Sequence, residues 1–415
     1  LHLLSRRQRQ MCIRDSPQAK EHAMTKKLDT QLLYLGTVPC GIVKNPEVPP
    51  IYPSTAYIID DMDDYDFASS GGRYFYSRTA NPNRDGLSQA ISYLEQGDAT
   101  IICSSGMAAI ATVLLGLLES GSHILMSQRI YGETIELANT LLKKFKIQIS
   151  YADFSNLSNV EELIQPNTRI LYTEIISNPL TQVVDINNLT KLAKKYDILT
   201  VIDSTFTTPF LIQPLTHGAD IVIHSLTKYF GGHSDITGGS ITASAGIIDA
   251  LLPQYLLLGC CLDPYSAWLI LRSIKTMGMR VRKQNENASA LAQALNNNPH
   301  VKAVYHPSLA DHPQHVLASK LLKDGYGAIL SFRITDSREK VNGFMHQLKL
   351  AKYLGTLGGI RTTYTHPATA FRKKFSPKAL MEMGLHEGLI RVSVGAEDID
   401  DLIDDFSQAL EICNS

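Results

Sequence analysis

Several marks of membrane, extracellular and nucleic-acid-binding proteins are missing from this sequence of 415 residues. No apolar run approaches the roughly 18 residues that a membrane-spanning helix needs. The 39 basic and 40 acidic residues almost cancel, so no electrostatic argument favours nucleic acid or an anionic membrane as a partner. The six cysteines are scattered, without the paired spacing of zinc ligands. We therefore expect no metal site, and a reduced cytoplasmic compartment is the simplest setting.

The chain is long enough for two or three domains, and its composition changes along its length. Residues 1–23 are rich in arginine and lack the long apolar segment of a signal peptide. We expect them to be a non-native or disordered leader, with an organellar transit peptide as the alternative. Residues 24–75 mix proline, tyrosine and acidic clusters, which predicts an extended N-terminal arm without regular structure. We place a large domain at 76–265 and a smaller α/β domain at 266–415.

The most informative stretch contains a lysine that follows a buried strand. An apolar run at 221–223 predicts the strand, and the hydroxyl residues Ser225 and Thr227 precede Lys228 and a glycine-rich segment. Desolvation or a neighbouring cation would lower the pKa of such a lysine and free its amine as a nucleophile. The alternative is a surface lysine beside a glycine turn, which is the commoner case for a lysine taken alone.

A second apolar strand, about 25 residues upstream, ends in Asp203. Ligands of open α/β sheets bind at the carboxyl ends of neighbouring parallel strands. A carboxylate and a lysine at that edge suit pyridoxal phosphate (PLP). The lysine would form an imine with the cofactor, and Asp203 would pair with its pyridinium nitrogen.

Residues 99–245 alternate predicted strands and helices, which favours a mostly parallel, doubly wound α/β sheet. A Ser-Ser-Gly turn at 104–106 opens one of these helices. The backbone N–H groups of Gly106 and Met107 would be free to bind an anion, here the PLP phosphate. An ordinary helix cap explains the same residues equally well.

Seven segments carry motifs in a fixed order. They are Tyr-Ser-Arg-Thr-Ala-Asn-Pro (76–82), Ser-Gly-Met-Ala-Ala-Ile (105–110), Tyr-Gly-Glu-Thr (131–134), Ser-Asn-Pro-Leu (177–180), Asp-Ser-Thr-Phe (203–206), His-Ser-Leu-Thr-Lys-Tyr (224–229) and Leu-Ile-Arg-Val-Ser-Val-Gly-Ala-Glu-Asp (389–398). In this order they resemble the PLP-dependent enzymes of cysteine and methionine metabolism, the group of cystathionine γ-synthase, cystathionine γ-lyase and methionine γ-lyase. The resemblance implies the aspartate-aminotransferase-like fold (fold type I) and a homotetramer of two active dimers.

The resemblance also implies the residues that bind the cofactor. Tyr76 and Arg78 would reach the PLP phosphate of the adjacent subunit, so that active sites are shared. Tyr131 would stack on the pyridine ring and could move protons. Ser225 and Thr227 would join the cofactor contacts beside Lys228.

The substrate contacts that the resemblance implies include three departures from the family pattern. Asn178 would contact the cofactor's 3′ oxygen and the substrate, and Arg391 would bind the substrate's α-carboxylate. Thr356 stands where serine is usual and keeps a hydroxyl. Glu133 stands where relatives mostly carry glycine or cysteine, and Arg361 where many carry glutamate. These two could be a swapped charge pair near the distal end of the substrate.

The implied function is a trans-sulfuration enzyme of amino-acid metabolism. A C–S γ-lyase that acts on cystathionine or methionine by γ-elimination is the main hypothesis. Cystathionine γ-synthase, O-acyl-homoserine sulfhydrylase and cystathionine β-lyase stay open as alternatives. A PLP-fold scaffold without catalysis belongs to a different class, and the presence of Lys228, Asp203, Tyr131 and Arg391 argues against it.

Overall fold

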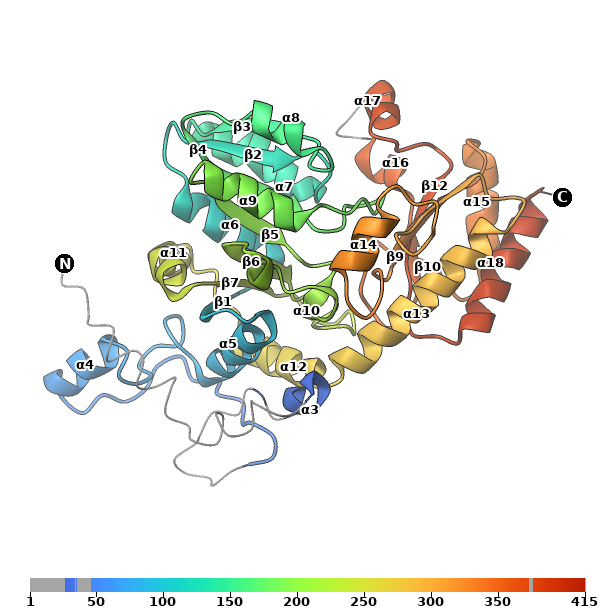
Figure 1. Cartoon of the computed structure of the whole chain (residues 1–415). Helices are drawn as coiled ribbons and strands as arrows, with labels where there is room; N and C mark the ends of the chain where they lie inside the picture. The colour runs from blue at the N-terminus through green and yellow to red at the C-terminus, as the bar shows by residue number, and fades with distance from the viewer. Residues whose placement is uncertain (1–26, 34, 36–45, 373–375, 415) are drawn as a thin grey trace.

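The computed structural model describes residues 27–33, 35, 46–372 and 376–414, and the expected leader at 1–23 lies outside them. Within these ranges the chain forms a seven-stranded sheet and a five-stranded sheet with helices packed around both (Figure 1). This architecture confirms the predicted α/β class.

The larger sheet has the strand order β1-β7-β6-β5-β4-β2-β3. Five adjacent strands, β6, β5, β4, β2 and β3, are parallel to one another. β7 runs antiparallel to both β6 and β1. The strands are β1 (Ala99–Cys103), β2 (His123–Ser127), β3 (Gln148–Ala152), β4 (Thr168–Glu174), β5 (Leu199–Asp203), β6 (Ile221–Ser225) and β7 (Gly239–Ala243). The sequence does not predict β7, because this strand begins at the end of a glycine-rich stretch that is typical of a turn.

Helices cover both faces of this sheet, and successive residues of a strand pack on opposite faces. Ile124 of β2 packs in one cluster with α6, and the next residue, Leu125, packs in another cluster with α9. Because both faces are buried, the strands read as continuous apolar runs. The helices of this part are α5 (Pro82–Glu95), α6 (Gly106–Leu117), α7 (Gly132–Leu137), α8 (Leu157–Glu162), α9 (Ile186–Lys195), α10 (Thr208–Leu211), α11 (Ala245–Leu258) and α12 (Pro264–Ile274). A π-helix, Ala138–Leu142, continues α7, and a 3₁₀-helix, Pro214–His217, precedes β6.

The N-terminal arm differs from its prediction in two places. The short helices α3 (Leu28–Leu32) and α4 (Met62–Ser69) interrupt a segment that we expect to lack regular structure. The side chain of Asp61 caps α4 by accepting the N–H of Asp64 at 2.8 Å. The acidic cluster therefore starts a helix, because carboxylates near a helix N-terminus are stabilising. In Figure 1, α4 lies away from both sheets.

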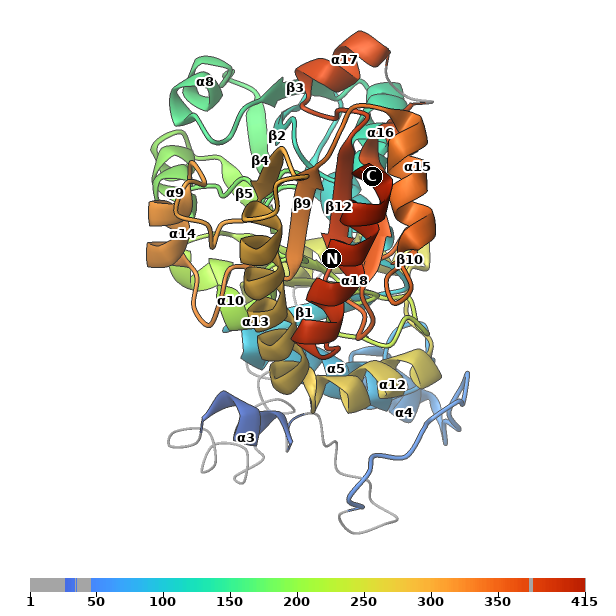
Figure 2. The same cartoon turned by 90° about the vertical axis from the view of Figure 1, so that its right-hand side faces the viewer.

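The second sheet has the order β10-β11-β12-β9-β8 and is antiparallel except between β10 and β11. Its strands are β8 (Ala303–Tyr305), β9 (Ile329–Arg333), β10 (Lys352–Tyr353), β11 (Thr363–Thr365) and β12 (Leu389–Ser393). The helices around it are α13 (Met277–Asn296), α14 (His315–Leu321), α15 (Arg338–Gln347), α16 (Pro367–Phe371), α17 (Pro377–Glu382) and α18 (Ile399–Asn414). Figure 2 shows α13, α15 and α18 beside β9 and β12. None of the helices in the described part of the chain is both long and apolar enough to cross a membrane.

One continuous core joins the two sheets. Leu87 and Leu94 of α5 belong to the same buried cluster as Phe332 of β9 and Phe406 of α18. α12 packs against α5, whereas α13 packs against β8, β9 and α18. The chain therefore passes from the part around the larger sheet to the part around the second sheet at α13. The domain boundary that the sequence predicts at residue 266 stays a prediction.

Candidate active site

The carboxyl ends of β5 and β6 bring Asp203 and Lys228 to the same edge of the larger sheet. The two strands are parallel, and Asp203 pairs in register with Ile223 of β6. Lys228 follows β6 in a tight turn in which its N–H donates to the carbonyl of Ser225 at 3.2 Å. The predicted juxtaposition of these strand ends is therefore present.

Lys228 lies in an environment that favours the neutral amine. Burial lowers the pKa of Lys228, the positive charge of Arg391 lowers it further, and Glu133 opposes both effects. Gly358 packs directly on this turn, since a side chain there would meet the backbone nitrogen of Tyr229 at 2.9 Å. A neutral amine is the form that acts as a nucleophile or accepts a proton.

Asp203 is a buried carboxylate with 8% exposure. Its Oδ1 accepts the N–H of Thr205 at 3.0 Å. Burial raises the pKa of Asp203, although the bonds from Thr205 and the charge of His224 oppose this effect. A cationic hydrogen-bond donor placed against this carboxylate would stabilise its ionised form.

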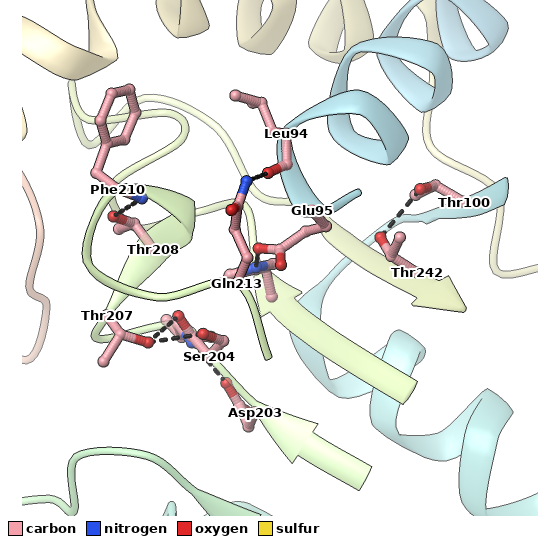
Figure 3. Close-up of polar contacts among 12 residues, drawn as sticks. Leu94, Glu95, Thr100, Asp203, Ser204, Thr207, Thr208, Phe210, Gln213 and Thr242 are labelled. Carbon is pink, nitrogen blue, oxygen red and sulfur yellow. Dashed lines mark hydrogen bonds and ion pairs between the residues drawn. The ribbon is translucent and has the colours of Figure 1, made fainter. Parts of the chain in front are cut away.

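The loop after Asp203 is held by its own hydrogen bonds (Figure 3). The hydroxyl oxygens of Ser204 and Thr207 lie 2.6 Å apart, and both side chains are buried. Farther along the chain, Gln213 donates to the carbonyl of Leu94 in α5 at 2.5 Å. These contacts fix the end of β5 relative to α5.

The N-terminus of α6 lies beside Ser225. Ser105 caps the helix by accepting the N–H of Ala108 at 3.0 Å, so the N–H groups of Gly106 and Met107 need another acceptor. A side chain at Gly106 would meet Cβ of Ser225 at 2.9 Å. Position 106 must therefore be glycine, and the absence of a side chain leaves the start of α6 accessible to a small anion such as a phosphate.

Arg391 on β12 is a buried guanidinium that faces no carboxylate among the described residues. It donates to Oδ1 of Asn178 at 3.3 Å and to the main-chain carbonyl of Thr356 at 3.2 Å. Among the described residues, its Nε has no hydrogen-bond partner. Burial lowers the pKa of Arg391 to about 10. The arrangement suits a ligand carboxylate. Thr356 thus contacts Arg391 through its backbone oxygen, and a role of its hydroxyl in substrate binding stays a prediction.

Tyr131 precedes the first turn of α7, and its backbone is anchored by a carboxylate. Its N–H donates to Oε1 of Glu174 at 2.7 Å. Burial, followed by the charge of Glu133 and a hydrogen bond with it, raises the pKa of Tyr131 to about 12. From the sequence, Glu174 at a strand end could be structural, and in the structure it ends β4 next to Asp203.

These groups together fit PLP. The cofactor carries a phosphate for the start of α6, a ring nitrogen for Asp203 and an aldehyde for Lys228. Among the described residues, no three His, Cys, Asp or Glu side chains gather in a way that could hold a metal ion.

Comparison with known proteins gives the same answer. The family model described as "Cys/Met metabolism PLP-dependent enzyme" matches residues 29–411. This chain belongs to that family. It is therefore a PLP-dependent enzyme, and the aspartate-aminotransferase-like fold that the sequence implies is confirmed.

Individual relatives of this family member cover most of its length. It is 41% identical to cystathionine gamma-lyase of Bacillus subtilis over 81% of this chain and 89% of the relative. It is 35% identical to L-methionine gamma-lyase of Fusobacterium nucleatum over 92% of this chain and 100% of the relative. A solved Campylobacter jejuni protein named as an O-acetylhomoserine (thiol)-lyase has a TM-score of 0.87 and 30% identity, and covers 92% of this chain and 99% of its own. That structure contains N′-pyridoxyl-lysine 5′-monophosphate.

Tyr76 and Arg78 of this family member lie outside the cluster around Lys228. Tyr76 bridges to Ala56 in the arm, and the Arg78 guanidinium lies 5.6 Å from the centroid of the Tyr76 ring. Arg78 donates to the carbonyl of Leu256 in α11 at 3.0 Å. Both side chains are exposed. Their proposed action in a neighbouring subunit's site stays a prediction.

The structure does not join Glu133 and Arg361. No ion pair between them occurs among the described residues, and both side chains are exposed. Glu133 lies in the first turn of α7 and acts on Tyr131 and Lys228, as their pKa shifts show. Arg361 follows Ile360, whose N–H donates to the carbonyl of Gly232 at 3.0 Å. The swapped charge pair is therefore absent from this structure.

Proposed function

We propose that this enzyme is a C–S γ-lyase that releases a thiol and 2-oxobutyrate from cystathionine or methionine. The observation that carries this proposal is the buried guanidinium of Arg391, which is close enough to lower the pKa of Lys228. A carboxylate held there would place an amino-acid Cα beside the amine. The 41% and 35% identical relatives named as γ-lyases support this reaction, and a 38% identical relative named as cystathionine beta-lyase keeps β-elimination as the alternative.

The residues of this chain would divide the work between binding and proton movement. PLP, when bound, supplies an electron sink for negative charge next to the substrate's α-carbon. Asp203 would hold the ring nitrogen protonated, and α6 with Ser225 and Thr227 would hold the phosphate. Lys228 Nζ would accept and return protons, and the Tyr131 hydroxyl, held by Glu133, is a second group in position to do so.

Product analysis tests the proposal directly. γ-Elimination of cystathionine gives cysteine, 2-oxobutyrate and ammonia, whereas β-elimination gives homocysteine, pyruvate and ammonia. We expect 2-oxobutyrate, with cysteine from cystathionine and methanethiol from methionine. Pyruvate as the main keto acid would contradict the γ-lyase assignment, and cystathionine formed from cysteine and an O-acyl-homoserine would favour γ-synthase. A homotetramer and a cytoplasmic location are part of the proposal.

Arg78 is expected to act in the neighbouring subunit's active site. Arg78→Ala and Lys228→Ala should each be inactive, and refolding them together should restore about a quarter of wild-type activity, because random pairing gives mixed dimers with one intact site. Arg78→Ala mixed with Tyr76→Ala is the control and should show no recovery, because every site then lacks one of the two residues. Mixed dimers without recovery in the first pair would place Arg78 in its own subunit's site.

Glu133 and Arg361 are expected to set the preference among substrates. Glu133→Gly should change the ratio of kcat/KM for cystathionine and methionine by about 10-fold, since a charge is removed near the leaving group. Arg361→Glu should weaken substrates with an anionic distal end. Glu136→Gly is the matched control for glycine in α7, and cofactor content should stay unchanged in all three variants. An unchanged substrate ranking in both site variants would show that the two residues are a solvated rim.

A further inference from the structure

A second pocket lies behind the first turn of α7, between the larger sheet and α17. Its volume is about 360 Å³, within the range of small-molecule sites. The walls come from the loops after β2 and β4, from α7 and from the segment around α17. Lys228, Asp203, Tyr131 and Arg391 do not line it, so this pocket adjoins the catalytic cluster without including its central residues.

Arg129 gives this pocket a positive group that is loosely paired with Asp153 and has one terminal nitrogen without a partner among the described residues. Its Nη1 is buried and has no hydrogen-bond partner among the described residues. The other terminal nitrogen, Nη2, is 3.9 Å from Asp153, beyond hydrogen-bond range. A guanidinium N–H that is hidden from water and unpaired is destabilising, and an anion in the pocket would satisfy it.

Most of the remaining wall is apolar. Ile130, Ile135, Leu180, Phe371 and Met383 contribute to it. Phe371 is packed tightly on the start of α7, since a side chain at position 132 would meet its ring at 2.7 Å. An occupant therefore needs a short apolar body as well as its charge.

A second charged residue on the wall does not cancel Arg129. Glu382 lines the pocket, but its side chain is 67% exposed and lies 4.0 Å from Lys378 on the same helix. Its charge is screened by solvent and shared with that lysine. Among the described residues, two buried polar groups of this wall lack a hydrogen-bond partner: Nη1 of Arg129, which is cationic, and the hydroxyl of Tyr151, which can also donate to an anion.

We propose that this pocket binds a short-chain carboxylate, with the carboxylate on Arg129 and the chain against the apolar wall. The pocket shares Asn178 with the catalytic cluster, and Oδ1 of Asn178 accepts from Arg391 at 3.3 Å. An occupant would thus contact the residue that holds the substrate-binding arginine. The inference does not depend on which sulfur amino acid is the substrate.

Titration of the PLP-loaded enzyme with butyrate tests the proposal by calorimetry. Arg129→Gln should weaken butyrate binding at least about 10-fold, which corresponds to one lost charge-assisted hydrogen bond. Met383→Trp, which fills the pocket and leaves Arg129 in place, should weaken it as well. Arg169→Gln removes an exposed arginine on β4 and is the matched control, with binding expected as in wild type.

Arg391 also offers a guanidinium to carboxylates, so the titration is repeated with Arg391→Gln. Binding that depends on Arg129 should persist in this variant. Loss of all butyrate binding in Arg391→Gln would assign the ligand to the substrate site and overturn the proposal. Unchanged binding in Arg129→Gln or in Met383→Trp would overturn it too, and so would a wild-type enzyme that binds no butyrate.

Discussion

Replacing Lys228 with alanine is expected to give a folded enzyme that turns over no substrate and carries no covalently attached cofactor. The side chain is partly buried at the end of β6, where burial and the charge of Arg391 lower its pKa and so favour the neutral amine. Loss of a group that serves as both nucleophile and proton acceptor removes two functions at once, so activity should fall below detection.

Borohydride reduction followed by peptide mapping measures this directly. In the wild-type enzyme the pyridoxyl group should lie on Lys228, and in Lys228→Ala no peptide should carry it. Lys191→Ala, an exposed position on α9, is the control and should keep both label and activity. Thermal unfolding with a wild-type profile would show that Lys228→Ala is folded. A pyridoxyl group found on a different lysine would refute the assignment.

The pairing of Asp203 with Lys228 is predictable from the sequence because it follows from local rules. Two apolar runs separated by a helical segment form parallel neighbours, and parallel strands end at the same edge of the sheet. The register of β5 and β6 then places Asp203 and the turn that contains Lys228 at the same edge of the sheet. The start of α6 is predictable for a similar reason, since a serine cap followed by glycine marks a helix N-terminus.

The substrate side of the site could not be derived in this way. Arg391 reaches Asn178 from β12 of the second sheet, and no local pattern shows that these strands meet. The resemblance to the family supplies both residues, but the contact with the backbone oxygen of Thr356 depends on the path of its loop. The contact of Glu174 could not be predicted, because its carboxylate accepts a backbone N–H and such a bond leaves no trace in residue spacing.

In the N-terminal arm, residue composition alone gives a wrong prediction of the secondary structure. Its acidic cluster at 60–66 looks like a solvated loop, but Asp61 uses one carboxylate oxygen to start α4. Capping depends on the position of one acidic residue relative to the next turn, and average composition does not carry that information.

Arg391→Gln is expected to lower kcat/KM by roughly 10²–10³-fold, because two charge-assisted hydrogen bonds to the substrate carboxylate are lost. Most of the loss should appear in KM, since the carboxylate is bound in the ground state as well. Arg391→Lys keeps the charge but not the planar fork of donors, so its loss should be smaller. The visible absorbance of the bound cofactor should be similar in all three proteins, because Arg391 is assigned to the substrate.

A substrate without a carboxylate separates recognition from a merely structural role. 3-(Methylthio)propylamine is methionine without its carboxylate, and it can be assayed for consumption alongside methionine. Wild-type enzyme should prefer methionine over this amine by a large factor, and Arg391→Gln should lose most of that preference. If the variant instead loses the same factor for both compounds, Arg391 supports the fold of the site. Its buried bonds to Asn178 and Thr356 would then be its main contribution.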